Sequence, residues 1–349
     1  MGAAAAAVQV DDNIKRSIYI RELLNGDRRN FAYSKMAEKT YSKAFSAMKH
    51  DIRLMNFARN IVGAVSDCYI LYAIAMMGVC DIESIMLFLR VLSNKNKELL
   101  IGDMRDYEGV YSRVELMVKN GMLFKHSFEF KREREGVKRP TVRINLYSIE
   151  KSAQHLITQK LGTKLAVNEW IDAKPLNELM GWAACGYVKG RVAECGRFLE
   201  YKQGVVRTKA IGTAIYPGEV KLQSKDGKPV SVAFVQAFMR HNKAFHTVEQ
   251  YQDMCIHTIN TIKQYFYMKD QKNDNCCVVV VVEDNPDLMT AGEIIHNAGI
   301  LKEDYDRIYF TGEGVIRGVP DSEVKDCFLQ LRDDGGENFM YVTADPVFV

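Results

Sequence analysis

Lysine and arginine side chains are concentrated between residues 125 and 143, where seven cations accompany three glutamates. Cations at this density can neutralise the phosphates of a nucleic acid and release its counterions. We therefore expect a phosphate-binding segment whose tip lies at residues 131–140. The seven cations are Lys125, Lys131, Arg132, Arg134, Lys138, Arg139 and Arg143.

The residues around this basic tip indicate how it is held. Residues 106–120 place apolar side chains at helical spacing and predict a helix, and Gly121 suits a left-handed helix end. Strand-like runs at 122–130 and 141–147 flank the tip. Helix, glycine, strand, basic loop and strand is the order of a winged helix-turn-helix. In such a domain the helix enters the major groove of DNA and the loop lies on the phosphates.

The helix over 106–120 has polar side chains outside its apolar stripe. Such groups can reach base edges or phosphates. They include Tyr111, Ser112, Arg113 and Lys119. Together with the seven cations of the basic segment they form the expected DNA interface, and we expect Arg113 to discriminate between bases.

Net charge divides the chain into two parts with different tasks. The 349 residues are enough for two domains. The formal net charge of +3 conceals +9 on residues 1–165 and −6 on residues 166–349. This asymmetry is typical of a polyanion-binding half joined to a half with another role.

The cysteines and the longest apolar stretch bear on where the protein works. The eight cysteines form no Cys-x-x-Cys pair, so we expect reduced thiols and no metal site. Residues 61–80 carry one charge, Asp67, and are nearly long enough to cross a bilayer. Ser66 and Asp67 have the pattern of a helix N-cap, which leaves only a short apolar helix. We expect a buried helix, no membrane partner and a cytoplasmic protein.

Three segments follow from the periodicity along the chain. Residues 1–60 are predicted to be an N-terminal helical arm, because Tyr41 and Phe45 begin a row at spacings of three and four. Residues 61–165 form the winged helix-turn-helix domain. Residues 166–349 combine helices at 174–194, 248–267 and 287–298 with strands at 198–201, 205–209, 211–216, 220–223, 230–235, 277–282 and 307–310. An Asp-Gly pair at 226–227 predicts a hairpin turn. The fold class is α+β, ending in an α/β domain with a mixed sheet.

Residues 67–165 resemble the winged-helix part of the replication-relaxation family. The resemblance rests on 110–114 (VYSRV), 119–123 (KNGML) and 145–148 (NLYS). It extends by element order over residues 65–315 and implies a second domain with a restriction-endonuclease-like fold. It also implies a relaxase or other mobilisation protein as partner, and a role in plasmid mobilisation and conjugation.

A nuclease of this fold would need an acid on one strand and an acid-x-Lys pair on the next, which hold Mg²⁺ and activate a water. The corresponding stretches, 216–218 and 231–236, contain no acid. Glu219 and Lys221 have acid-x-Lys spacing but precede the Asp-Gly turn. We therefore expect a nuclease-like scaffold that has lost catalysis, with Glu219 and Lys221 as the only catalytic candidates.

The sequence thus predicts a double-stranded DNA-binding accessory protein that helps assemble a relaxase complex, the relaxosome, at an origin of transfer. No cofactor is expected, and a second copy of the chain is a further candidate partner. One alternative is a metal-dependent nickase or nuclease that uses Mg²⁺ or Mn²⁺. Another is a transcriptional regulator whose acidic domain senses a ligand.

Overall fold

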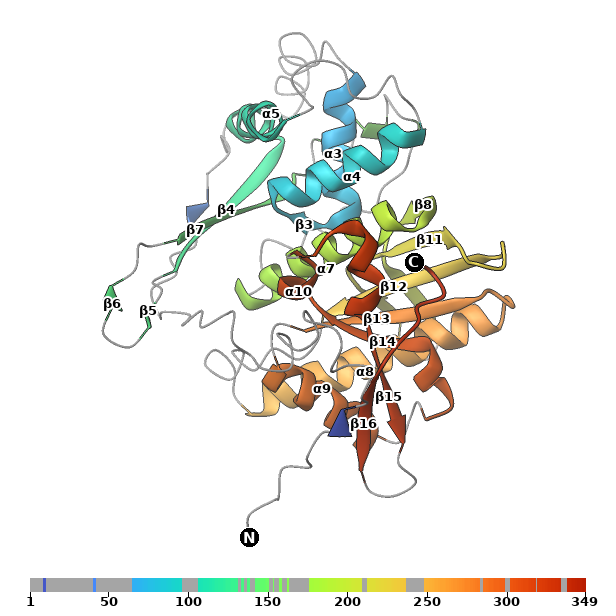
Figure 1. Cartoon of the computed structure of the whole chain (residues 1–349). Helices are drawn as coiled ribbons and strands as arrows, with labels where there is room; N and C mark the ends of the chain where they lie inside the picture. Colours follow the sequence, from blue (N-terminus) through green and yellow to red (C-terminus); the bar gives the residue numbers. More distant parts are fainter. Residues whose placement is uncertain are drawn as a thin grey trace. The chain divides into compact units, whose positions relative to one another are not determined.

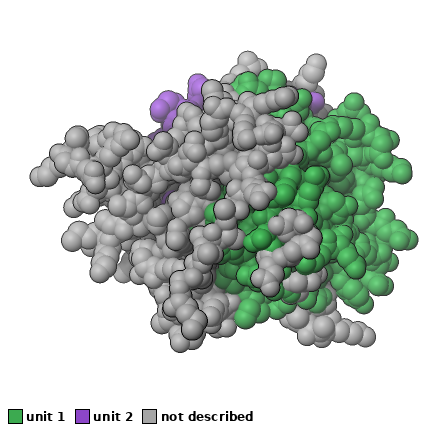
Figure 2. Space-filling model, turned by 60° about the horizontal axis from the view of Figure 1, so that its bottom comes forward, with its two compact units in different colours: residues 1–29, 191–349 green, residues 30–190 purple. Residues whose placement is uncertain are grey.

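The computed structural model describes parts of the chain that form two compact units (Figures 1 and 2). Unit 1 comprises residues 1–29 and 191–349, and unit 2 comprises residues 30–190. The described residues are 9–10, 40–41, 65–95, 106–130, 133–134, 137–138, 142–150, 153, 157–158, 162, 176–208, 212–236, 248–282, 285–298, 302–317, 319–333 and 338–349. The division into units falls within helix α7, Leu176–Cys195. Residue 165, the predicted end of the winged-helix domain, lies outside the described residues.

Unit 2 combines helices with a small antiparallel sheet (Figure 1). Its helices, besides the first part of α7, are α3 (Val65–Met77), α4 (Ile82–Lys95) and α5 (Tyr107–Lys119). Its strands are β2 (Thr40–Tyr41), β3 (Val79–Cys80), β4 (Leu123–Phe130), β5 (Glu133–Arg134), β6 (Val137–Lys138) and β7 (Val142–Ile149).

The sheet of unit 2 joins the hairpin to the strand between the first two helices. Its order is β2-β4-β7-β3. Strands β4 and β7 pair along their full length, from Leu123 opposite Ile149 to Phe130 opposite Val142. Strand β3 then pairs antiparallel with β7, with Val79 opposite Ser148. The two strands predicted on either side of the basic tip are confirmed.

Helix α5 begins and ends at local sequence signals. The Asp106 carboxylate accepts a hydrogen bond from the Gly109 amide at 2.7 Å, which caps the first turn. Gly121 follows the C-cap with φ of 72°, a left-handed conformation that glycine adopts without steric cost. The helix predicted over 106–120 is confirmed. Asp81 caps α4 in the same way, because it accepts from the Ser84 amide at 2.8 Å.

The apolar stretch around residue 70 is a core helix of unit 2. Ile70, Leu71 and Ile74 of α3 are completely buried, as expected of a helix that is apolar on all sides. Among the described residues, no helix is long and apolar enough to cross a membrane. The N-cap predicted at Ser66 and Asp67 is wrong, because α3 begins at Val65 and both residues lie in its first turn.

The helical arm predicted for residues 1–60 is wrong at the few positions that are described. Gln9–Val10 forms strand β1, which pairs parallel with β16 (Phe339–Thr343) of unit 1. Thr40–Tyr41 forms β2, which pairs with β4 of unit 2. Both segments extend an existing sheet edge, where backbone hydrogen bonds outweigh a helical side-chain pattern. The other residues of this segment lie outside the described part.

Unit 1 contains a mixed sheet of eight strands, in the order β1-β16-β15-β14-β13-β12-β11-β8. Its other strands are β8 (Arg197–Lys202), β11 (Glu219–Gln223), β12 (Pro229–Gln236), β13 (Cys276–Val282), β14 (Ile308–Gly312) and β15 (Leu329–Asp333). Strands β8, β11 and β12 are successively antiparallel, and β12, β13 and β14 are parallel. A separate hairpin joins β9 (Val205–Thr208) and β10 (Gly212–Ile215).

Helices and short 3-10 turns complete unit 1. They are α8 (Val248–Asp270), α9 (Asn285–Asn297), α10 (Glu313–Arg317), η5 (Lys302–Arg307) and η6 (Asp321–Cys327). Helix α8 packs on β12 and β13, and α9 packs on β13 and β16 (Figure 1). Strand β13 is buried along its whole length.

The elements expected in the C-terminal half are largely confirmed, and so are the α+β class and the mixed sheet. The long helix ends at Asp270 instead of 267. The apolar run at 277–282 is strand β13. The Asp-Gly hairpin forms as expected: the Ser224 amide donates to the Lys228 carbonyl at 2.8 Å, and Gly227 has φ of 84°.

Candidate functional site

Helix α5 was expected to carry DNA-contacting side chains, and burial defines its outer face. Val110, Val114 and Met117 are completely buried and orient the helix against the core of unit 2. Outside this stripe, Ser112 and Lys119 are exposed and Tyr111 is half-buried. These three residues are placed where an approaching ligand can reach them.

Arg113 is held inside unit 2 by an acid of another helix. Its Nε donates to Asp67 Oδ1 at 2.9 Å, and its Nη2 donates to Asp67 Oδ2. The Asp67 side chain is completely buried, and that of Arg113 is 31% exposed. A paired guanidinium neutralises a carboxylate that would otherwise be buried with an uncompensated charge. The geometry therefore favours a structural role for Arg113 over the expected contact with bases.

Lys125 is also paired within the unit. Its Nζ lies 2.6 Å from Glu115 Oε1, and the same oxygen accepts a hydrogen bond from the Tyr147 hydroxyl at 2.8 Å. Burial raises the pKa of the Tyr147 phenol, and the bond to Glu115 raises it further. Glu115 thus ties α5 to β4 and β7, which fixes the helix beside the strands that lead to the basic tip.

Two tyrosines on α5 form a stacked pair that was not predicted from the sequence. The rings of Tyr107 and Tyr111 are nearly parallel, at 8°, with centroids 6.2 Å apart. Tyr107 is 47% exposed. The Nζ of Lys125 lies 6.0 Å from the centroid of the Tyr111 ring. The sequence feature that could have predicted this pair is the spacing of four between two aromatic residues of one helix. This spacing places their side chains next to each other on the helix surface.

The basic tip is described only in part. Arg134 lies in β5 and Lys138 in β6, where the backbone register sets Glu133 opposite Lys138. Arg143 lies in β7 opposite Glu129 of β4. Lys131, Arg132 and Arg139 lie outside the described residues, and so do the side chains of Arg134, Lys138 and Arg143.

Glu219, the first catalytic candidate, is a buried residue in an ion-pair cluster of unit 1. Its Oε1 lies 3.1 Å from Lys269 Nζ and 3.8 Å from Lys202 Nζ. The Tyr216 hydroxyl donates to Glu219 Oε2 at 3.3 Å. Burial raises the pKa of the Tyr216 phenol, and the Glu219 charge raises it further, so the phenol keeps the proton it donates.

This cluster does not have the composition of a metal-dependent nuclease site. Lys221, the second candidate, is half-exposed and lies opposite Glu200 of β8. The carboxylate of Glu219 is already neutralised by the ammonium groups of Lys269 and Lys202, and Lys202 also lies 3.9 Å from the Glu200 carboxylate. In the part of the chain that is described, no group of three or more His, Cys, Asp or Glu could hold a metal ion.

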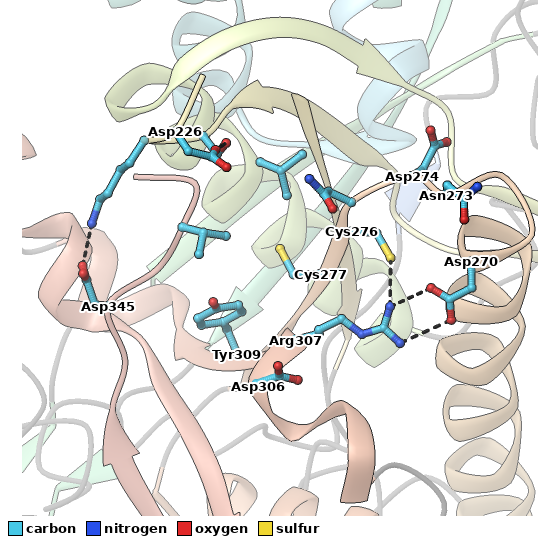
Figure 3. Close-up of a pocket in the computed structure, with 15 residues that line it drawn as sticks. Asp226, Asp270, Asn273, Asp274, Cys276, Cys277, Asp306, Arg307, Tyr309 and Asp345 are labelled. Atoms are coloured by element: carbon cyan, nitrogen blue, oxygen red, sulfur yellow. Dashed lines mark hydrogen bonds and ion pairs between the residues drawn. The ribbon is translucent and has the colours of Figure 1, made fainter. Parts of the chain in front are cut away.

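A cavity of about 730 Å³ opens in unit 1 at the amino ends of the parallel strands (Figure 3). It lies between the β11–β12 turn, the α8–β13 connection and the start of β14. Arg307 lies at one side, 2.8 Å from Asp270 and 4.3 Å from the centre of the Phe266 ring. Lys225 and Asp345 form a second ion pair, 2.6 Å apart, at another side of the cavity (Figure 3).

Charge in this cavity does not suit a phosphate ligand. Five aspartates line it against one lysine and one arginine, and both cations are paired with carboxylates. The thiols of Cys276 and Cys277 also line it. Burial raises the pKa of Cys276 to about 11, so at neutral pH this thiol is protonated and is a poor nucleophile.

Comparison of the chain with models of known protein families, with curated proteins and with solved structures found no match.

Proposed function

We propose that unit 2 contains a winged-helix domain that binds double-stranded DNA. The observation that carries this proposal is the pairing of β3 with β7, with Val79 opposite Ser148. The elements α3, β3, α4, α5, β4 and β7 follow in the order of a winged helix, which is a helix, a short strand, two helices and a hairpin. In that fold the second strand of the hairpin pairs with the short strand, as β7 pairs with β3. The hairpin tip is then the wing, and α5 is the groove-reading helix.

Affinity for DNA comes mainly from the wing in this proposal. Arg113 and Lys125 are engaged by Asp67 and Glu115, so they stabilise the domain that presents the other groups. Phosphate contacts fall to Lys131, Arg132, Arg134, Lys138, Arg139 and Arg143. Ser112 and Lys119, exposed on α5, are the side chains that reach the groove.

We propose that unit 1 is a nuclease-like scaffold without nuclease chemistry. The succession α7, β8, β11, β12, α8, β13, with three antiparallel strands followed by a parallel one, supports a restriction-endonuclease-like fold. The ion pair between Lys269 and Glu219 supports the proposed loss of DNA cleavage, because it neutralises the candidate catalytic carboxylate. In line with the resemblance to the replication-relaxation family, unit 1 would dock a relaxase or a second copy of the chain at an origin of transfer.

The salt dependence of DNA affinity tests the proposed DNA binding. Fluorescence anisotropy with a labelled duplex compares the wild type with a variant in which Lys131, Arg132, Arg134, Lys138 and Arg139 are replaced by Gln. A matched control replaces five exposed cations of unit 1, namely Lys225, Lys228, Lys272, Lys325 and Arg332. Each lost phosphate contact should reduce the slope of log K against log salt by about 0.9. Equal slopes for the two variants would reject the role of the wing.

A further inference from the structure

The stacked tyrosines of α5 pack differently from the aromatic core of unit 2. Tyr72 and Phe88 are another aromatic pair of unit 2. Their rings meet edge to face at an interplanar angle of 73°, and Phe88 is completely buried. Tyr107 and Tyr111 instead lie parallel at 8°, and Tyr107 is 47% exposed. Tyr107 therefore presents part of a flat aromatic ring to solvent, where a ligand can contact it.

The surroundings of this pair define what could cover it. Tyr111 has the Lys125 ammonium 6.0 Å from its ring centroid, and that ammonium is held by Glu115. Ser112, the next residue of α5, is exposed and can donate or accept a hydrogen bond. A flat ring beside an exposed hydroxyl matches a nucleobase, which offers a planar face and polar edges.

Whether a base is paired determines whether it can stack on the Tyr107–Tyr111 pair. In a continuous duplex each base is covered by its neighbours, so proteins reach only the base edges in the grooves. The flat face of a base becomes available when the base is unpaired and leaves the stack. A tyrosine ring can then stack on it whatever the base identity.

We propose that Tyr107 and Tyr111 form a stacking platform for an unpaired DNA base, so that unit 2 prefers DNA containing unpaired bases over a continuous duplex. This inference rests on the proposed DNA binding and defines its target more narrowly. The wing supplies salt-dependent affinity for any DNA, and the tyrosine pair adds the preference for locally separated strands.

The preference is measured on the full-length protein with two labelled oligonucleotides, a continuous duplex and the same duplex with a three-base mismatch bubble. We expect the wild type to bind the bubble about tenfold more tightly, near the lower end for stacking of one base on an aromatic ring. Tyr107→Phe keeps the ring and should retain the preference. Tyr107→Leu should lose it while its duplex affinity stays unchanged. Tyr267→Leu, which alters a 61% exposed tyrosine on α8, is the matched control and should behave as the wild type.

A 2-aminopurine base in the bubble reports stacking directly. We expect its fluorescence to fall when the wild type or Tyr107→Phe binds, and to stay unchanged with Tyr107→Leu. Equal affinity of the wild type for both oligonucleotides, or full preference in Tyr107→Leu, would overturn the stacking platform and leave duplex binding intact. Absence of binding to either oligonucleotide at low salt would overturn the DNA-binding proposal itself, and the platform with it.

Discussion

Arg113 of α5 donates two hydrogen bonds to the carboxylate of Asp67, a completely buried residue in the first turn of α3. The two residues are 46 positions apart in the chain. This bidentate pair fixes the orientation of α5 relative to α3. Arg113, which was expected to discriminate between bases, is thus part of the structure that holds α5 in place.

Replacing Arg113 tests whether this residue stabilises the folded protein through its pair with Asp67. Arg113→Met leaves the Asp67 carboxylate buried without its cation, so we expect a loss of about 2–3 kcal/mol in the free energy of unfolding. The double variant with Asp67→Asn should lose less, because no buried charge remains. Chemical denaturation measures both. A base-reading residue would instead change the preference between DNA sequences and leave stability nearly untouched.

Lys189 is a buried cation whose removal should stabilise the protein. Its ammonium donates to the Met76 carbonyl at 3.2 Å, and burial lowers its pKa from 10.5 to about 8. In the unfolded chain Lys189 binds a proton up to about pH 10.5, whereas in the folded chain it loses that proton near pH 8. Below pH 8 the folded chain therefore carries a buried charge on Lys189, which lowers the free energy of unfolding. This loss disappears as the pH rises from 8 to 10.5.

Lys189→Met should therefore raise the free energy of unfolding by about 1–3 kcal/mol at pH 7, with little or no gain at pH 10. Urea denaturation of the wild type and the variant at both pH values measures the difference. Lys228→Met, which alters an exposed lysine, serves as control and should show no pH-dependent difference. An equal gain in the free energy of unfolding at pH 7 and pH 10 would show that the effect does not come from a buried charge on Lys189.

The ion pair between Glu219 and Lys269 gives a third prediction. Both side chains are about 95% buried, so Lys269→Met leaves Glu219 with only the more distant Lys202. We expect a loss of about 3 kcal/mol in the free energy of unfolding. Lys202 is 37% exposed, and Lys202→Met should cost less than about 1 kcal/mol. Equal losses in the two variants would show that the pair is not the dominant interaction.

Cleavage of DNA is the fourth prediction. Because Lys269 already neutralises Glu219, the wild type should leave supercoiled plasmid intact in the presence of Mg²⁺ or Mn²⁺. Agarose gels of plasmid incubated with the wild type and with Glu219→Ala make the comparison. Nicking by the wild type that is lost in Glu219→Ala would restore the nuclease alternative.

Elements whose signals are local could be predicted from the sequence. Asp106 and Gly121 set the two ends of α5, and Asp226 with Gly227 sets the β11–β12 turn. Each of these signals acts through the backbone within a few residues. The positions of these elements therefore followed from short stretches of sequence.

Features that depend on distant contacts could not be predicted in the same way. Asp67 has the pattern of a helix cap, but its partner is Arg113. Glu219 and Lys221 have nuclease-like spacing, but Lys269, 50 residues further along the chain, neutralises the acid. The short strand β2 adopts its conformation from the neighbouring β4 instead of from its own helical pattern. In each case the deciding group is supplied by the fold.

Cross-linking to DNA tests the central claim most directly. The full-length protein is bound to a duplex carrying bromodeoxyuridine and irradiated, and the cross-linked peptides are identified by mass spectrometry. The winged-helix account predicts cross-links within α5 and within residues 131–143 that disappear at high salt. Cross-links confined to unit 1, or none at low salt, would contradict it.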